Sequence, residues 1–122
     1  MQSVSSNAVY NALSGFSTNA QTYFVQADTS HTFSNLVPTD GKYLVFIEVV
    51  FVPYYGQLGN GYFTWTGASG VERALIFTGY ASWGYGNSNP IIVENGLSVN
   101  VYWDYGTTNS VVYLKVLYKK IL

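Results

Sequence analysis

The sequence predicts an all-β protein: an antiparallel β-sandwich, jelly-roll-like, with a short helix at its N-terminus. Val, Ile, Phe, Tyr and Thr fill many short segments, and Gly-containing dipeptides separate these segments. Aromatic residues make up 18% of the 122 residues and charged residues 9%, far below the roughly 25% of ordinary soluble domains. Short strands at close spacing with Gly-rich turns are typical of sandwiches. We therefore expect one β domain over residues 18–122, preceded by a helical segment over residues 1–17.

The N-terminal segment MQSVSSNAVYNALSGFS has the pattern of a short helix. We expect it to run from about Ser6 to Ser14, with Ser5 or Ser6 as N-cap and Gly15 as the C′ residue. Its apolar residues then gather near one side: Val9, Ala12, Leu13 and Phe16. A helix below about 12–15 residues is marginal in water, so it needs a docking surface or copies of itself. The polar stretch Ser17–Gln21 is predicted as its linker to the β domain.

The strands of the β domain are predicted from runs rich in β-branched and aromatic residues. These runs are Thr22–Gln26, His31–Leu36, Lys42–Val52, Tyr62–Thr66, Val71–Thr78, Pro90–Glu94, Leu97–Tyr105 and Ser110–Ile121. Dipeptides that accept positive φ punctuate them: Asp40-Gly41, Asn60-Gly61, Asn95-Gly96 and the weaker Ser69-Gly70. They predict successive antiparallel hairpins. The segment Gly79–Pro90 is predicted as the longest loop.

Two of the predicted strands are apolar on both faces. In Lys42–Val52, one face carries Tyr43, Val45, Ile47, Val49 and Phe51, and the other carries Leu44, Phe46, Val50 and Val52 around Glu48. The C-terminal strand has the same character. One face meets the opposite sheet, so the other needs a helix, a loop or another subunit. Because the chain has so few charges, we expect oligomerisation to cover these faces.

Charge and composition exclude several classes of function. A net charge of −1 lacks the basic surface of a nucleic-acid binder. The longest apolar run, Tyr43–Val52, is about half a bilayer span and contains Glu48, so no membrane insertion is expected. Without Cys the chain has no thiolate ligand or cysteine nucleophile. We expect no cofactor, because phosphate-cradling and dinucleotide-binding glycine patterns are absent.

The ionisable residues give no strong sign of catalysis. The segment DTSH places Asp28 and Ser30 next to His31, but neighbouring side chains on a strand diverge, which makes a poor triad. The six carboxylates are scattered, and a glycosidase needs two of them about 5–10 Å apart. Oxygen ligands in Asp104–Asn109 suit calcium, but we interpret them as turn residues. We expect neither an enzyme nor a metal site.

Aromatic residues near the turns are the unusual resource of this chain. Exposed Tyr and Trp offer flat apolar faces and polar edges, and neighbouring amides supply hydrogen bonds, which is the combination that suits sugar rings. The candidate ligand-binding residues are Trp83, Tyr85, Tyr80, Tyr54 and Tyr55, with Asn87 and Asn89 as hydrogen-bonding partners. The alternative is that these rings cap the core or fill a subunit interface.

The segment SVSSNAVYNALSG, Ser3 to Gly15, resembles the S-x-A-V-x-x-A-L segment that precedes the C-terminal domain in tail-fibre and receptor-binding proteins of tailed bacteriophages. This resemblance implies a homotrimer on the virion, exposed to the exterior. Residues 1–17 would end the fibre stalk, and residues 18–122 would form a distal head that binds a bacterial surface receptor. With the aromatic residues, the expected receptor is a glycan. The alternatives are a purely structural virion tip or trimerisation domain, and a polysaccharide-degrading enzyme.

Overall fold

The computed structural model describes residues 15–54, 58–67, 70–80, 84–104 and 109–122. These residues form strands, turns and bends, and no helix occurs among them. Within the same ranges, no helical segment is long and apolar enough to cross a membrane. The helix expected from Ser6 to Ser14 lies outside the described residues.

Nine strands account for most of the described chain. They are β1 (Ser17–Phe24), β2 (Ser30–Phe33), β3 (Lys42–Val52), β4 (Leu58–Gly67), β5 (Gly70–Tyr80), β6 (Gly84–Asn87), β7 (Ile91–Glu94), β8 (Ser98–Trp103) and β9 (Val111–Lys120). The strand runs predicted from the sequence therefore correspond to real strands, and β6 is an addition to them.

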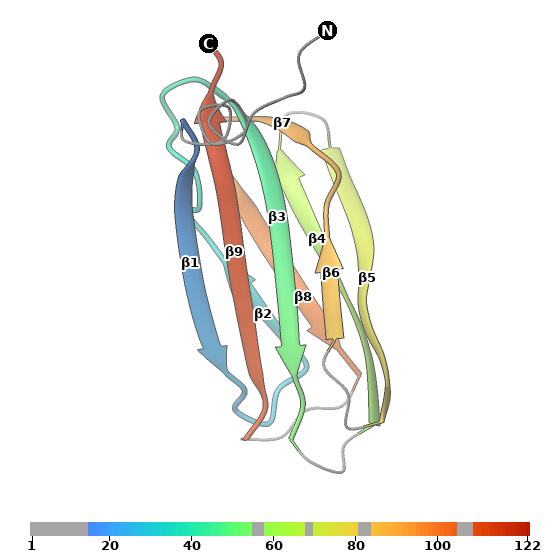
Figure 1. The fold of residues 1–122 in the computed structure, drawn as a ribbon. Helices are drawn as coiled ribbons and strands as arrows, with labels where there is room; N and C mark the ends of the chain where they lie inside the picture. Colours follow the sequence, from blue (N-terminus) through green and yellow to red (C-terminus); the bar gives the residue numbers. More distant parts are fainter. Residues whose placement is uncertain (1–14, 55–57, 68–69, 81–83, 105–108) are drawn as a thin grey trace, which may run out of the picture.

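The strands form two antiparallel sheets that pack face to face (Figure 1). The first sheet has the order β1-β9-β3-β6, and β7 pairs with the same strand β3. Along β3, β6 pairs with Glu48–Phe51 and β7 with Lys42–Val45. The second sheet has the order β2-β8-β4-β5. This is the strand order of a jelly roll in which β6 and β7 share the place of one strand, so the predicted β-sandwich is confirmed.

Side chains from both sheets meet in one core. One of the two apolar faces of β3 is at most 5% exposed and consists of Tyr43, Val45, Ile47, Val49 and Phe51. β8 and β9 contribute Val99, Val101, Trp103, Val112, Leu114 and Val116, all at most 3% exposed. The alternation in the sequence therefore assigned the residues of β3 to its two faces correctly, because side chains on a strand point to opposite faces in turn, and the structure shows which of the two faces is buried.

The predicted hairpins are mostly wrong. Asn95 and Gly96 both have positive φ, 65° and 91°, as the turn prediction requires. The strands they connect, β7 and β8, nevertheless lie in different sheets, and so do β2 and β3 on either side of Asp40-Gly41. Asn60-Gly61 lies inside β4, where the register shifts. Only around Ser69-Gly70 do consecutive described strands pair, because β4 and β5 pair up to Gly67 and Gly70.

Two further local predictions are corrected. Ser17–Gln21 is not a linker, because it is the first part of β1 and pairs along β9. Its polar residues suit an edge strand with one side in water. Polar residues are also typical of loops, so their polarity alone predicted a linker. Gly79–Pro90 is not one loop, because β5 extends to Tyr80 and Gly84–Asn87 forms β6. The inward positions of β6 are the buried Gly84 and Gly86, which carry no side chain that marks a strand.

The edge of the sandwich between β1 and β2 is closed by stacked rings. Tyr23 lies parallel to His31, with ring centroids 3.7 Å apart, and His31 meets Phe33 edge-on at 4.7 Å. The Tyr23 hydroxyl donates a hydrogen bond to the Asp28 carboxylate. Burial lowers the pKa of His31 below its ordinary 6.5, against the opposing charge of Asp28. His31 therefore packs as part of this edge of the sandwich.

This lowered pKa predicts a pH-dependent stability. Between the folded and unfolded pKa values, the unfolded chain binds the His31 proton more readily than the folded chain does. The free energy of unfolding is therefore unaffected by His31 protonation above pH 6.5, the ordinary pKa of histidine, and it falls as the pH drops through this value. Urea unfolding at about pH 7.5 and about pH 5.5 measures the loss, and His31→Phe should remove most of it. An equal loss in both proteins would contradict the assignment. Asp40 does not interfere, because its lowered pKa acts only below its ordinary 3.8.

Candidate functional site

The structure places two predicted site residues on one strand. Tyr85 and Asn87 project from β6 on the outer face of the first sheet, opposite Val50 and Glu48 of β3. Tyr85 is 55% exposed. The two side chains therefore lie on the flat of a sheet rather than in a loop.

The other predicted residues are dispersed or not described. Tyr54 follows β3 and is 46% exposed, and its backbone N–H donates to the Ser110 hydroxyl at 3.0 Å. Asn89 is exposed after β6, and Tyr80 is the last residue of β5. Tyr55 and Trp83 lie outside the described residues. The predicted set therefore stays a prediction.

A cleft of about 340 Å³ opens on the second sheet. Its lining comes from β4, β5, β8 and the residues beside them: Thr29, Asn60, Gly61, Tyr62, Leu75, Tyr102, Trp103 and Asp104. Tyr62 and Tyr102 are half-buried on the outer face, while their neighbours Phe63, Val101 and Trp103 point into the core. The alternation of the strands thus supplies both the core and the cleft wall.

Two tyrosines form the aromatic wall of the cleft. Tyr62 and Tyr102 are direct cross-strand partners, and their rings stack with centroids 4.9 Å apart and an interplanar angle of 22°. The Arg73 guanidinium lies 5.4 Å from the centre of the Tyr62 ring. A cross-strand aromatic pair stabilises a sheet by about 0.2–1 kcal/mol, so the wall is held in place before any ligand arrives. Leu75, 63% exposed and opposite Tyr62 on β5, extends the apolar surface.

Hydrogen-bond acceptors gather at the polar end of the cleft. The Asp104 carboxylate accepts from the Asn60 backbone N–H at 2.7 Å and from Asn60 Nδ2 at 3.3 Å. The Asp104 N–H donates to the Asn60 carbonyl at 3.0 Å. These bonds fix both side chains and leave the Asn60 Oδ1 and further carboxylate lone pairs free to accept. Neither the Tyr62 nor the Tyr102 hydroxyl has a hydrogen-bond partner among the described residues.

This arrangement suits a neutral ligand that carries several hydroxyl donors and an apolar face. Acceptors need donors, and the exposed Asp104 disfavours an anionic ligand. Asp104 is the only carboxylate among the described residues that line the cleft. No group of three His, Cys, Asp or Glu side chains is placed to hold a metal in the part of the chain that the structure describes.

None of the cleft residues belongs to the predicted set. Tyr62 begins the predicted strand Tyr62–Thr66, and Tyr102 lies within the predicted strand Leu97–Tyr105. Asn60 was assigned to a turn. The sequence does show a Tyr at an outward position on each of the two strands. Only the strand order shows that these strands are neighbours.

No protein-family model and no curated protein matches the sequence. Among solved structures, the chain is similar to TmCBM61, solved in complex with β-1,4-galactotriose, at 12% identity, 98% coverage of this chain, 100% of that chain and a TM-score of 0.43. It is also similar to the acidic stable capsid of Helicobacter pylori bacteriophage KHP30, at 13% identity, 82% and 92% coverage and a TM-score of 0.42. The CBM22-1 xylan-binding domain of Paenibacillus barcinonensis Xyn10C is similar at 12% identity, with 88% coverage of each chain and a TM-score of 0.38. Likeness at this level transfers no function, so the function is inferred from this chain's own side chains.

Proposed function

We propose that this protein is a non-enzymatic carbohydrate-binding head domain whose cleft on the second sheet holds a neutral sugar. The observation that supports this most directly is the stacked Tyr62–Tyr102 wall beside the fixed Asp104–Asn60 acceptors. Phenol rings cover the C–H surface of a pyranose, and the acceptors bind its hydroxyl groups. With a single carboxylate on the described lining, the cleft binds the glycan without hydrolysing it.

The setting we propose is the distal end of a bacteriophage tail fibre, where the domain binds a glycan on the bacterial surface during adsorption. The N-terminal resemblance supports this setting, and so does the sparsely charged, aromatic composition. We propose a homotrimer on the virion. Three equal weak sites on one head gain avidity through effective concentration, which suits adsorption to a surface.

The aromatic residues predicted from the sequence are the second candidate for the same function. They comprise Trp83, Tyr85, Tyr80, Tyr54 and Tyr55, with Asn87 and Asn89 as the predicted hydrogen-bonding partners. Tyr54 and Tyr85 favour it, because both side chains are about half exposed. Their variants are therefore the natural controls for the cleft.

Tyr102→Ala is expected to weaken glycan binding at least tenfold, which is about 1.4 kcal/mol or more. The wild type would first be screened on an array of neutral and acidic bacterial surface oligosaccharides. Calorimetry with the best neutral ligand would then compare the wild type, Tyr102→Ala and the control Tyr54→Ala, each checked for folding by circular dichroism. Wild-type affinity in Tyr102→Ala, or loss in Tyr54→Ala alone, would move the site away from the cleft. Release of reducing sugar from the ligand would overturn the non-enzymatic assignment.

A further inference from the structure

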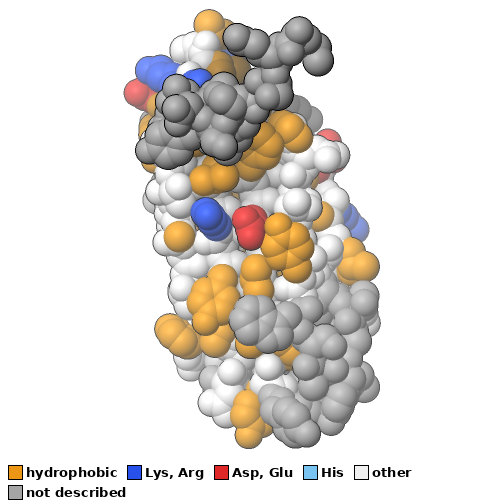
Figure 2. Space-filling view, in the orientation of Figure 1, with side chains coloured by type: hydrophobic (Ala, Val, Ile, Leu, Met, Phe, Trp, Pro, Cys, Tyr) orange, Lys and Arg blue, Asp and Glu red, His pale blue; other side chains and the backbone are white. Residues whose placement is uncertain are grey.

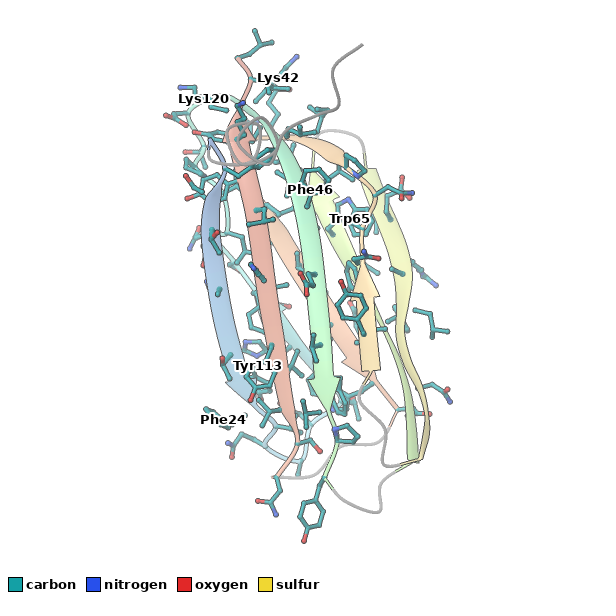
Figure 3. All side chains as sticks on the ribbon, in the orientation of Figure 1. Phe24, Lys42, Phe46, Trp65, Tyr113 and Lys120 are labelled. Carbon is teal, nitrogen blue, oxygen red and sulfur yellow. The ribbon has the colours of Figure 1, made fainter. Side chains whose placement is uncertain are left out.

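The outer face of the first sheet carries an unusual concentration of exposed apolar side chains. We define the aromatic face as Phe24, Tyr113, Val50, Tyr85, Val111 and Val52. Phe24 is 61%, Tyr85 55% and Tyr113 44% exposed. Figure 2 shows hydrophobic side chains gathered over the lower part of this face, and Figure 3 labels Phe24 and Tyr113 among them. Apolar surface gathered on one sheet face marks an interaction site more often than scattered apolar residues do.

The side chains on this face are arranged in rows across the strands. Tyr113 is the partner of Val50, and Val50 is the partner of Tyr85, so these three share one row. The next row contains Lys115, Glu48 and Asn87. Each row runs perpendicular to the strands, with about 4.8 Å between neighbouring strands. An apolar row thus lies next to a row that contains one cation and one anion.

The two charges in the polar row have no ion-pair or hydrogen-bond partner among the described residues. Lys115 and Glu48 are cross-strand partners, and Figure 2 shows a basic and an acidic side chain next to each other in the middle of the face. The structure nevertheless records no ion pair between them and, in the described part of the chain, no hydrogen bond to either side chain. A partner that carries an anion and a cation level with this row could form ion pairs with both Lys115 and Glu48.

The predicted stalk segment joins the domain on this same face. The Phe16 ring packs edge-on against Phe46 with centroids 5.6 Å apart, and Lys119 Nζ lies 5.9 Å from the Phe16 ring centre. Phe46 and Lys119 both belong to the outer face of the first sheet. If the preceding residues form a stalk on a symmetry axis, the first sheet is the sheet that lies next to the axis.

We propose that the aromatic face is the contact surface between copies of this chain, arranged with their strands parallel around an axis. Such an axis keeps every row at its own height, so the aromatic row of one copy meets aromatic rows, and Lys115 of one copy meets Glu48 of the next. The face is therefore complementary to itself in both polarity and charge. This inference rests on the homo-oligomeric part of the proposed function and is independent of glycan binding.

The test compares lysine substitutions on the two opposite sheets. Phe24→Lys and Tyr113→Lys place a charge on the aromatic face, whereas Val71→Lys places one on the second sheet at a side chain that is 63% exposed. Sedimentation at micromolar concentration should give the wild type and Val71→Lys a multiple of 13.5 kDa, and the aromatic-face variants the monomer mass. A monomeric wild type, or aromatic-face variants with the wild-type mass, would overturn the proposal. Circular dichroism verifies that each variant is folded.

A mixing experiment tests the charge pairing between chains. Glu48→Lys and Lys115→Glu each give the polar row a single sign, so each variant alone should sediment as a monomer. An equal mixture should regain assembled mass, because two of the three contacts in a mixed trimer then join rows of opposite sign, and no rearrangement within one chain can produce that result. A mixture that stays monomeric would refute the pairing. Glycan affinity per chain, measured by calorimetry on monomeric Tyr113→Lys, should equal that of the wild type, so failure of the interface and failure of the glycan site are distinguishable.

Discussion

Replacing Trp103 by alanine is expected to lower the free energy of unfolding by about 3–5 kcal/mol, a large part of the 5–15 kcal/mol that domains typically have. The side chain is 3% exposed and packs on Phe51, with ring centroids 5.6 Å apart. Its Nε1–H donates to the Asp28 carbonyl at 2.6 Å, and its backbone N–H donates to the Thr29 carbonyl at 2.9 Å. Trp103 therefore ties the chain before β2 to β8 and fills the core at the same place.

Trp103→Phe separates the contribution of core packing from that of the Nε1–H hydrogen bond. It keeps most of the ring volume but leaves the Asp28 carbonyl without its donor, so the expected loss is about 1–3 kcal/mol. Urea unfolding followed by circular dichroism gives both values. Equal stability of Trp103→Ala and the wild type would show that the end of the sandwich is not built as described. Because Trp103 also lines the cleft, Trp103→Ala should weaken sugar binding as well, even at temperatures where it remains folded.

The two faces of each long strand were predictable from the sequence because alternation is a local property. Each inward residue of β3 sits two positions from the next, and hydrophobicity at that period requires nothing from the rest of the chain. The pairing partner of each strand could not be predicted from local sequence. Asn95-Gly96 does adopt the positive φ values that its composition favours, yet β8 pairs with β2 and β4 rather than with β7. A turn dipeptide sets the local backbone, whereas the burial of two sheet faces decides which sheet a strand joins.

The same reason explains why the cleft was missed. Tyr62 and Tyr102 are far apart in the sequence and become neighbours only because β8 lies between β2 and β4. The Asp104–Asn60 bonds have the same origin, since they join the end of β8 to the start of β4. Rings that are dense in one stretch of sequence, such as those of Gly79–Pro90, are easy to notice and need not form one surface. Tyr85, for example, lies on the first sheet beside Val50, on the opposite side of the sandwich from Tyr102.

The requirement for glycine at position 86 follows from how the open edge of the sandwich closes. β6 belongs to the first sheet and β5 to the second, and Gly86 faces Ile76 of β5. A Cβ at Gly86 would lie 2.6 Å from Ile76 Cγ2, 3.0 Å from Ile76 Cα and 3.1 Å from the Leu75 carbonyl oxygen. Two of these atoms belong to the backbone, so a change of rotamer cannot relieve the contact. Gly86→Ala must therefore push the two strands apart.

We expect Gly86→Ala to lower the free energy of unfolding by about 1–3 kcal/mol, as overpacking usually does. The matched control is Gly15→Ala, where the new Cβ would meet only the flexible Lys119 side chain, at 3.3 Å. Its effect should stay within about 0.5 kcal/mol. Urea unfolding measures both, and equal losses would show that β5 and β6 do not pack as closely as described. Because Leu75 lies on the displaced strand and forms part of the cleft wall, Gly86→Ala should also weaken sugar binding, a coupling that Gly15→Ala should lack.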